Sequence, residues 1–190
     1  MPDPKGDIRR VAVLISGRGS NMRALVGGQG AYQVLLVASN KPHAEGLVWA
    51  RARGLPTWVW DRQGVEKEDF DRVLGLALRD HRVGTIALAG FMRILSPAFV
   101  AEWNGRIVNI HPSLLPKYRG LDTHRRALDA GDTVAGCSVH LVTDELDAGA
   151  VLGQTEVAIQ PDDDAASLES RVLAAEHKLY PDILNRFVRQ

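Results

Sequence analysis

The residues best suited to chemistry are Asn109 and His111, which stand two positions apart at the end of an apolar run. The run over residues 107–110 is typical of a short buried strand, and Pro112 favours an extended conformation for the residue before it. Side chains two apart on a strand share a face, so an amide and a group that titrates near neutral pH are expected to project together. Such a pair could hold a reacting carbonyl, with the amide stabilising its oxygen and the imidazole handling a proton.

An interior histidine beside an ordinary strand end is the other interpretation of His111, and the pair alone does not decide between them. The acidic loop over residues 143–149 adds Asp147 as a third candidate, although acidic loops are commonly plain solvated turns. Folded over the strand end, Asp147 would pair with His111 and raise its pKa, which keeps an imidazolium available. Because no serine or cysteine nucleophile accompanies these groups, we interpret the chemistry as acyl transfer to an amine of the substrate.

A second candidate site is the glycine-rich turn over residues 16–21, between an apolar run at 11–15 and a helical pattern that starts at Met22. A strand, a glycine-rich turn and a helix start together present free backbone N–H groups to an anion. Ser20 or Asn21 could cap that helix or contact a phosphate directly. The glycine spacing matches neither the dinucleotide nor the nucleoside-triphosphate signature, so a tight turn without a ligand is the alternative.

The third candidate is the apolar segment over residues 91–95, which carries Arg93 and follows a buried run at 84–90. Two interpretations of Arg93 stay open. Its segment could pack in the core with the guanidinium at the surface, or it could form an apolar slot in which the guanidinium meets a carboxylate.

Alternating strands and helices must position these candidates. The predicted strands cover residues 11–15, 34–40, 57–60, 84–90, 107–110, 136–142 and 150–157, and the predicted helices cover 22–26, 43–53, 65–81, 97 onward, 123–130 and a last helix after 161–164. This order predicts an α/β fold, with a doubly wound, mostly parallel sheet flanked by helices and an antiparallel hairpin near the C-terminal part. Ligands of such sheets bind beyond the carboxyl ends of the strands, so we expect the three candidates at one edge. His140, on the hairpin, is predicted to be structural.

The composition is that of an ordinary globular chain of 190 residues, 45% hydrophobic and 24% charged. Lys plus Arg equals Asp plus Glu, 23 against 23, so charge predicts neither a nucleic-acid nor a membrane partner. The single cysteine, Cys137, excludes an internal disulfide, and no ligand spacing indicates a metal. Without a signal segment or an apolar run of about 18 residues, the chain is expected to be cytoplasmic. We expect one domain over residues 1–190, with a polar tail at 1–8, and leave the oligomeric state open, a homodimer included.

Four ordered motifs resemble those of the phosphoribosylglycinamide formyltransferases, a family of folate-dependent formyltransferases: LISGRGSN at 14–21, LAGFMRILS at 88–96, NIHPSLLPKY at 109–118 and SVHLVTDELD at 138–147. The resemblance extends from about Val11 to Tyr180 and implies the Rossmann-like formyltransferase fold. It also implies formyl transfer from 10-formyltetrahydrofolate to the amine of glycinamide ribonucleotide, a step of purine synthesis that needs no metal.

The resemblance implies a role for each candidate residue. His111 would be the proton donor, Asn109 would stabilise the oxyanion, and Asp147 would raise the pKa of His111. The remaining positions would contact the two substrates: Gly19, Ser20, Asn21 and Glu176 the glycinamide ribonucleotide, and Lys67, Met92, Arg93, Ile94, Leu95 and Asn109 the folate.

Three residues depart from the family pattern: Arg18, Arg119 and Asp122 stand where we expect Asn, Pro and His. Arg18 could add attraction for a phosphate or point outward, and the other two bear on the shape of the loop around them.

Three rival functions remain. A formyltetrahydrofolate hydrolase shares the chemistry but hands the formyl group to water, and such enzymes usually carry an N-terminal regulatory domain, whereas about ten residues precede Val11 here. A methionyl-tRNA formyltransferase would need a C-terminal RNA-binding domain and a basic charge balance. A non-catalytic nucleotide- or folate-binding module would make the set of Asn109, His111 and Asp147 a coincidence.

Overall fold

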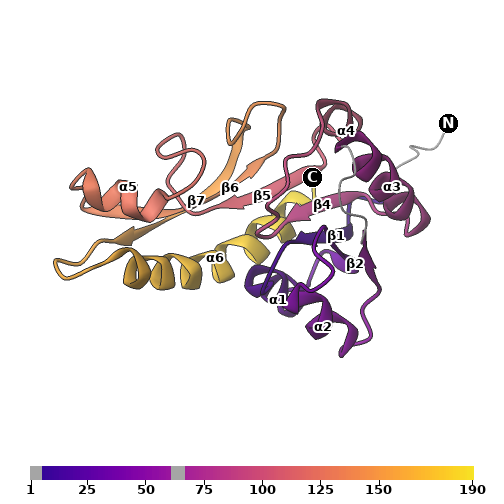
Figure 1. Cartoon of the computed structure of the whole chain (residues 1–190), viewed down its shortest axis with the longest axis horizontal. Coiled ribbons are helices and arrows are strands. Elements are labelled where there is room, and N and C mark those ends of the chain that lie inside the picture. Colours follow the sequence, from indigo (N-terminus) through magenta and orange to yellow (C-terminus); the bar gives the residue numbers. More distant parts are fainter. Residues whose placement is uncertain (1–5, 61–66) are drawn as a thin grey trace.

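The computed structural model describes residues 6–60 and 67–190, and its centre is a seven-stranded sheet with the order β3-β2-β1-β4-β5-β6-β7 (Figure 1). Strands β1 to β5 are parallel, and β6 and β7 each pair antiparallel with the preceding strand. The predicted doubly wound sheet and its hairpin are therefore confirmed. The strands are β1 (Arg10–Ile15), β2 (Gln33–Ser39), β3 (Thr57–Val59), β4 (Thr85–Leu88), β5 (Ile107–His111), β6 (Val134–Leu141) and β7 (Val151–Ala158); the helices are α1 (Ser20–Gly27), α2 (Glu45–Arg51), α3 (Lys67–Asp80), α4 (Pro97–Glu102), α5 (Thr123–Asp129) and α6 (Ala165–Phe187).

Helices cover both faces of the sheet, and the alternation of side chains along β1 gives each face its own core (Figure 1). Val11, Val13 and Ile15 point to one face and pack with residues of α1, α2 and α6. Ala12 and Leu14 point to the other face, toward α3 and α4. All five side chains are fully buried. A central parallel strand that is covered on both sides needs the continuous apolar run seen in the sequence.

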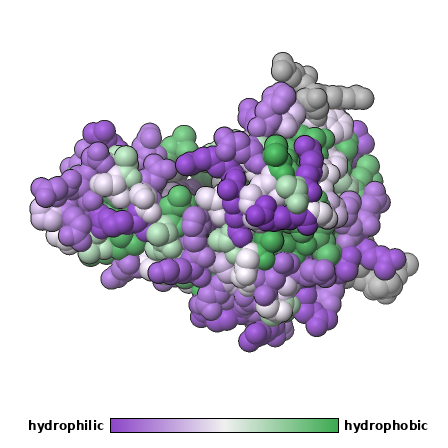
Figure 2. Space-filling model, turned by 90° about the horizontal axis from the view of Figure 1, so that it is seen from below, coloured by the Kyte–Doolittle hydropathy of each residue, from purple (hydrophilic) through white to green (hydrophobic). Residues whose placement is uncertain are grey.

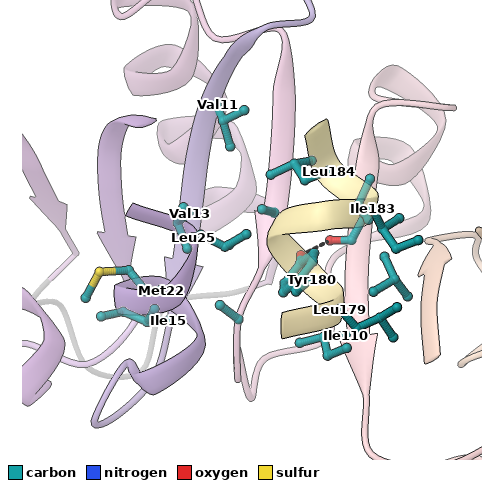
Figure 3. Close-up of a cluster of buried hydrophobic side chains, with 14 of the residues drawn as sticks. Val11, Val13, Ile15, Met22, Leu25, Ile110, Leu179, Tyr180, Ile183 and Leu184 are labelled. Carbon is teal, nitrogen blue, oxygen red and sulfur yellow. Dashed lines mark hydrogen bonds between the residues drawn. The ribbon is translucent and has the colours of Figure 1, made fainter. Parts of the chain in front are cut away.

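Tyr180 of α6 joins the first core to two strands of the sheet (Figure 3). Its hydroxyl lies 3.0 Å from the carbonyl oxygen of Leu88 and 2.9 Å from that of Val108, on β4 and β5. Burial raises the pKa of the Tyr180 phenol, so the group remains a neutral donor. The helix thereby holds together the two strands that end beside the candidate site.

Side chains cap the starts of the two helices that were expected from residue 97 onward and after residues 161–164. Ser96 accepts a hydrogen bond from the N–H of Phe99 at 3.3 Å, and Pro97 is the first residue of α4. Asp164 accepts the N–H of Ser167 at 2.7 Å and donates its own N–H to the Ser167 hydroxyl at 3.0 Å, which closes a capping box on α6.

Figure 2 views the molecule from the side of α1, α2 and α6. Hydrophilic residues cover most of this face. The apolar side chains of α6 point inward: Leu168, Val172, Leu179 and Ile183 are buried, and Ala175 is half-buried. Among the described helices, none is long and apolar enough to span a membrane.

Part of the predicted N-terminal tail is attached to the sheet. The N–H of Gly6 donates to the carbonyl oxygen of Val83 at 2.9 Å, and the carbonyl oxygen of Ile8 accepts from the Thr85 hydroxyl at 2.6 Å. Residues 6–8 are therefore held at the amino end of β4, and residues 1–5 lie outside the described part of the chain.

The carboxyl ends of β1, β4 and β5 lie side by side, because these strands are neighbours in the sheet. The N–H of Ser16 donates to the carbonyl oxygen of Gly90 at 3.1 Å, and the N–H of Met92 donates to the Ser16 hydroxyl at 2.7 Å. His111 is the last residue of β5, the next strand. The three candidate segments thus meet at one edge, as their positions after parallel strands predicted.

Candidate active site

His111 lies at the carboxyl end of β5 with only 5% of its surface exposed. Its Nε2 is 2.9 Å from the backbone carbonyl oxygen of Tyr118, and its Nδ1 is 3.4 Å from Oδ2 of Asp147. Both neighbours are hydrogen-bond acceptors. A ring N–H of His111 is therefore held at the end of β5, where it could pass a proton to a substrate.

Asp147 belongs to the acidic loop between β6 and β7, and this loop folds over the end of β5. Its carboxylate accepts a hydrogen bond from the N–H of Gly120 at 3.0 Å, and its Oδ1 is 3.6 Å from Nε2 of His140. The backbone φ of Asp147 is 50°, in the left-handed region that residues other than glycine seldom adopt. Such a conformation persists only where surrounding contacts hold it. The structure thus brings Asp147 and His111 together.

Asn109 faces His140, a residue that the sequence did not associate with the site. Strands β5 and β6 pair so that the two residues are opposite each other, with Asn109 Nδ2 at 3.1 Å from His140 Nε2. His140 Nδ1 is 2.8 Å from the carbonyl oxygen of Leu141, so Nδ1 carries the proton and Nε2 accepts. Burial lowers the pKa of His140, which keeps the ring neutral. One N–H of Asn109 is therefore directed to His140, and the amide carries a second N–H that can serve a substrate oxygen.

The glycine-rich turn requires glycine at position 19. Gly19 occupies the N-cap position of α1 with a φ of 73°, and a Cβ there would lie 2.9 Å from Cε of Met22 and 3.2 Å from Cα of Gly46. Within the described residues no side chain caps α1, so of the two alternatives for Ser20 and Asn21, a cap or a phosphate contact, the structure does not show the cap. The first N–H groups of the helix are thus left to another acceptor, and an anion suits them.

Asn21 and Glu176 are in direct contact although they lie at opposite ends of the chain. Asn21 Nδ2 donates to Glu176 Oε2 at 2.6 Å, which explains why Asn21 does not cap α1. The two side chains are buried, with 7% and 6% of each residue exposed. Burial raises the pKa of Glu176 to about 7, although the bond from Asn21 acts in the opposite direction. Asn21 and Glu176 were both predicted to contact the ribonucleotide, and they form a buried pair. Within it, the Glu176 carboxyl titrates near pH 7.

Glu176→Gln is expected to change how stability depends on pH. Between about pH 4.5 and pH 7 the folded protein keeps a proton on Glu176 that the unfolded chain has lost, so the contribution of Glu176 to the unfolding free energy falls by about 3 kcal/mol as pH rises through this range. Glutamine still accepts from Asn21 but does not titrate, so the variant should lack this decline. Urea unfolding of both proteins at pH 5 and pH 8 measures the difference, and identical pH dependence would contradict the assignment.

The segment predicted to contact the folate presents both exposed and buried side chains. Met92 and Ile94 are 72% and 69% exposed, whereas Leu95 is buried in the core against α3 and α4. The Arg93 guanidinium lies over the ring of Phe70, 4.6 Å from its centroid. Met92 and Ile94 are thus the apolar side chains that this segment offers to a ligand.

Two further expectations concern Lys67 and metal ions. Lys67 is the first residue of α3, and its side chain lies outside the described part of the structure. In the residues that are described, no group of three or more His, Cys, Asp and Glu side chains is arranged to hold a metal ion.

A family model described as formyl transferase matches residues 9–184, a range that contains all seven strands. The chain belongs to the formyl transferase family. Asn109, His111 and Asp147 all lie within the range that carries this formyl transferase match.

Other formyl transferases resemble the chain over nearly its whole length. It is 44% identical to the phosphoribosylglycinamide formyltransferase of Escherichia coli strain K12, over 93% of this chain and 86% of that protein. The crystal structure of the phosphoribosylglycinamide formyltransferase from Brucella melitensis superposes with a TM-score of 0.91 at 46% identity, over 95% of this chain and 96% of that chain. The trifunctional purine biosynthetic protein adenosine-3 of Drosophila melanogaster is 48% identical over 95% of this chain, which spans only 14% of that protein.

The position of His140 beside Asn109 does not follow from the sequence of this chain. The alternation of residues 136–142 assigns His140 to one face of its strand, but it does not give the register of that strand against β5. The register alone decides that His140 contacts Asn109, and no local pattern in the sequence signals it.

Proposed function

We propose that this formyl transferase moves the formyl group of 10-formyltetrahydrofolate to the amine of glycinamide ribonucleotide, giving formylglycinamide ribonucleotide and tetrahydrofolate in de novo purine biosynthesis. The likeness to the Escherichia coli phosphoribosylglycinamide formyltransferase over 93% of the chain supports this substrate pair most strongly. The meeting of Asn109, His111 and Asp147 at the end of β5 supports acyl transfer as the chemistry.

In the proposed reaction, the neutral substrate amine attacks the formyl carbon. The new C–N bond moves the carbonyl electrons onto oxygen, and N–H groups of Asn109 and His111 stabilise this oxyanion. When the carbonyl re-forms, the bond to N10 of the folate breaks, and His111 gives its proton to that nitrogen. The extra proton on the former amine then passes to His111, which ends the cycle as an imidazolium.

The hydrogen bonds of His111 indicate which nitrogen acts. Asp147 faces Nδ1, so we assign proton donation to Nε2. The carbonyl oxygen of Tyr118 accepts from Nε2 at 2.9 Å and would be replaced there by the substrate. Asp147 then stabilises the imidazolium without contacting the reacting atoms, and it positions His111 for the transfer.

The substrates are proposed to bind at the other two candidate segments at this edge of the sheet, residues 16–21 and 91–95. N–H groups at the start of α1 would hold the ribonucleotide phosphate, and a Glu176 carboxyl that is partly protonated near pH 7 could donate to or accept from a ribose hydroxyl. The residues proposed to contact the ribonucleotide are Gly19, Ser20, Asn21 and Glu176. Those proposed to contact the folate, from the family resemblance, are Lys67, Met92, Arg93, Ile94, Leu95 and Asn109.

The alternative is a formyltetrahydrofolate hydrolase, in which water replaces the amine. Tetrahydrofolate release from 10-formyltetrahydrofolate, measured with and without glycinamide ribonucleotide, separates the two activities. We expect release to require the ribonucleotide and to match the formylglycinamide ribonucleotide formed. Release that is independent of the ribonucleotide would favour the hydrolase.

Asp147→Asn is expected to lower kcat by about 10-fold, because an amide oxygen accepts from Nδ1 of His111 more weakly than a carboxylate does. Steady-state rates at saturating substrates measure the effect. Asp144→Asn, at an exposed residue of the same loop, is the matched control and should keep the natural kcat. An unchanged kcat for Asp147→Asn would mean that the acidic loop is only a turn.

The proposal extends to the organisation of the protein. It includes a single formyltransferase domain over residues 1–190 that acts in the cytoplasm, and a homodimer is the oligomer to test first, by sedimentation.

A further inference from the structure

Two loops meet beside the candidate site, and each supplies one group of an ion pair. The loop after β5 is here residues 117–122, the second half of the connection from β5 to α5, and the acidic loop covers residues 143–149. Arg119 Nη1 in the first loop lies 2.7 Å from Glu145 Oε1 in the second. Both side chains remain accessible, with 42% and 72% exposed, so the pair lies on the outer surface of the two loops.

A second contact joins the same loops one residue further on. Gly120, next to Arg119, donates its N–H to Oδ2 of Asp147, which is two residues beyond Glu145. This oxygen is also the one that faces Nδ1 of His111. The ion pair and the Gly120 bond therefore act on the same short stretch of backbone, the stretch that orients the carboxylate.

The loop after β5 is itself held from α5. Arg126 Nη1 donates to the carbonyl oxygen of Arg119 at 2.6 Å and to that of Leu121 at 3.2 Å, and its guanidinium lies over the ring of Tyr118 at 5.2 Å. These contacts hold the backbone at position 119, so the Arg119 side chain can restrain the acidic loop.

We propose, resting on the function proposed above, that Arg119 and Glu145 are positioning residues that hold the Asp147 carboxylate against His111. Asp147 needs such a restraint because its left-handed backbone is unfavourable for a residue with a Cβ. Its own loop supplies little burial, since residues 143–146 are all exposed. The family resemblance leads us to expect proline at position 119, and proline could not form this pair.

The expected effect is small but directed at the reaction. Exposed ion pairs contribute little to global stability, so loss of this pair should leave thermal unfolding nearly unchanged. The equilibrium constant between the placed and the displaced forms of Asp147 should fall instead, by about 1.5- to 5-fold for a pair of this kind. We expect this fall to lower kcat by no more than the same factor, with a smaller change in KM for either substrate.

The test is a double-mutant cycle with Arg119→Gln, Glu145→Gln and both together, plus the charge-reversed protein Arg119→Glu with Glu145→Arg. The matched control is the Arg79–Glu102 pair, which has a similar distance of 2.6 Å and partly exposed side chains but joins α3 to α4 away from the site. Its Arg79→Gln and Glu102→Gln variants should keep the natural kcat. Hydrogen exchange of the Gly120 amide, followed by NMR, gives a readout that needs no substrate.

Each single variant should speed Gly120 exchange by about 1.5- to 5-fold and lower kcat by no more than this factor. The double variant should be no slower than either single one, and charge reversal should restore most of both properties. Losses that multiply in the double variant, equal losses in the Arg79–Glu102 controls, or unchanged Gly120 exchange would overturn the proposal. If the natural protein transfers no formyl group to the ribonucleotide, the proposed function fails, while Gly120 exchange still decides whether the pair restrains Asp147.

Discussion

His111→Ala is expected to lower kcat for formyl transfer by about 10²–10⁴-fold, the range that general acid–base catalysis contributes. The variant lacks the group that donates a proton to the leaving nitrogen. Water cannot replace it well, because it is a far weaker acid than an imidazolium. Initial rates of tetrahydrofolate release at saturating substrates measure the effect.

A matched control separates chemistry from folding. His81→Ala removes a histidine at the end of α3, where Nδ1 lies 2.8 Å from the carbonyl oxygen of Ala77, and it should leave kcat unchanged. Added imidazole should recover part of the activity of His111→Ala, since the deletion opens space beside Asp147. A rate for His111→Ala close to that of the natural protein would remove His111 from the mechanism.

Asn109→Ala is expected to lower kcat by about 10²–10³-fold, which is the usual cost of losing one donor to an oxyanion. The amide is held ready for this task, since Nδ2 is oriented by Nε2 of the neutral His140 at 3.1 Å. An interaction made only in the transition state should change kcat, whereas an interaction made equally with bound substrate should change KM. Steady-state kinetics with varied 10-formyltetrahydrofolate distinguishes the two outcomes, and a change in KM alone would make Asn109 a binding residue.

The loss of Asn109 also leaves His140 without its donor, so stability needs its own control. A buried group without its partner costs about 1–3 kcal/mol, and rates should be compared well below the melting temperature of each variant. Asn185→Ala is the matched control, because this amide bonds to Gly28, Ala31 and Pro181 at the far side of α6. It should lower the melting temperature without lowering kcat, and a similar loss of kcat there would assign the Asn109 effect to destabilisation.

The elements that the sequence predicted correctly are those that depend on short-range patterns. The apolar run of β1 and the starts of α4 and α6 each follow from the backbone needs of a few adjacent residues. Parallel order then follows from alternating strands and helices, because crossover connections have one hand. His111 could be placed at the ligand edge of the sheet for that reason alone.

The contacts that make this edge a site were decided by tertiary structure. Asn21 could equally have capped its own helix, and only the packing of α6 against α1 brings Glu176 within 2.6 Å of it. The strand register places His140 opposite Asn109, and the fold of the acidic loop brings Glu145 to Arg119. Each pair joins residues that are distant in the chain, so its energy depends on how whole elements pack and not on any local preference. The sequence by itself determined which residues reach the end of the sheet, and the packing determined which of their atoms face one another.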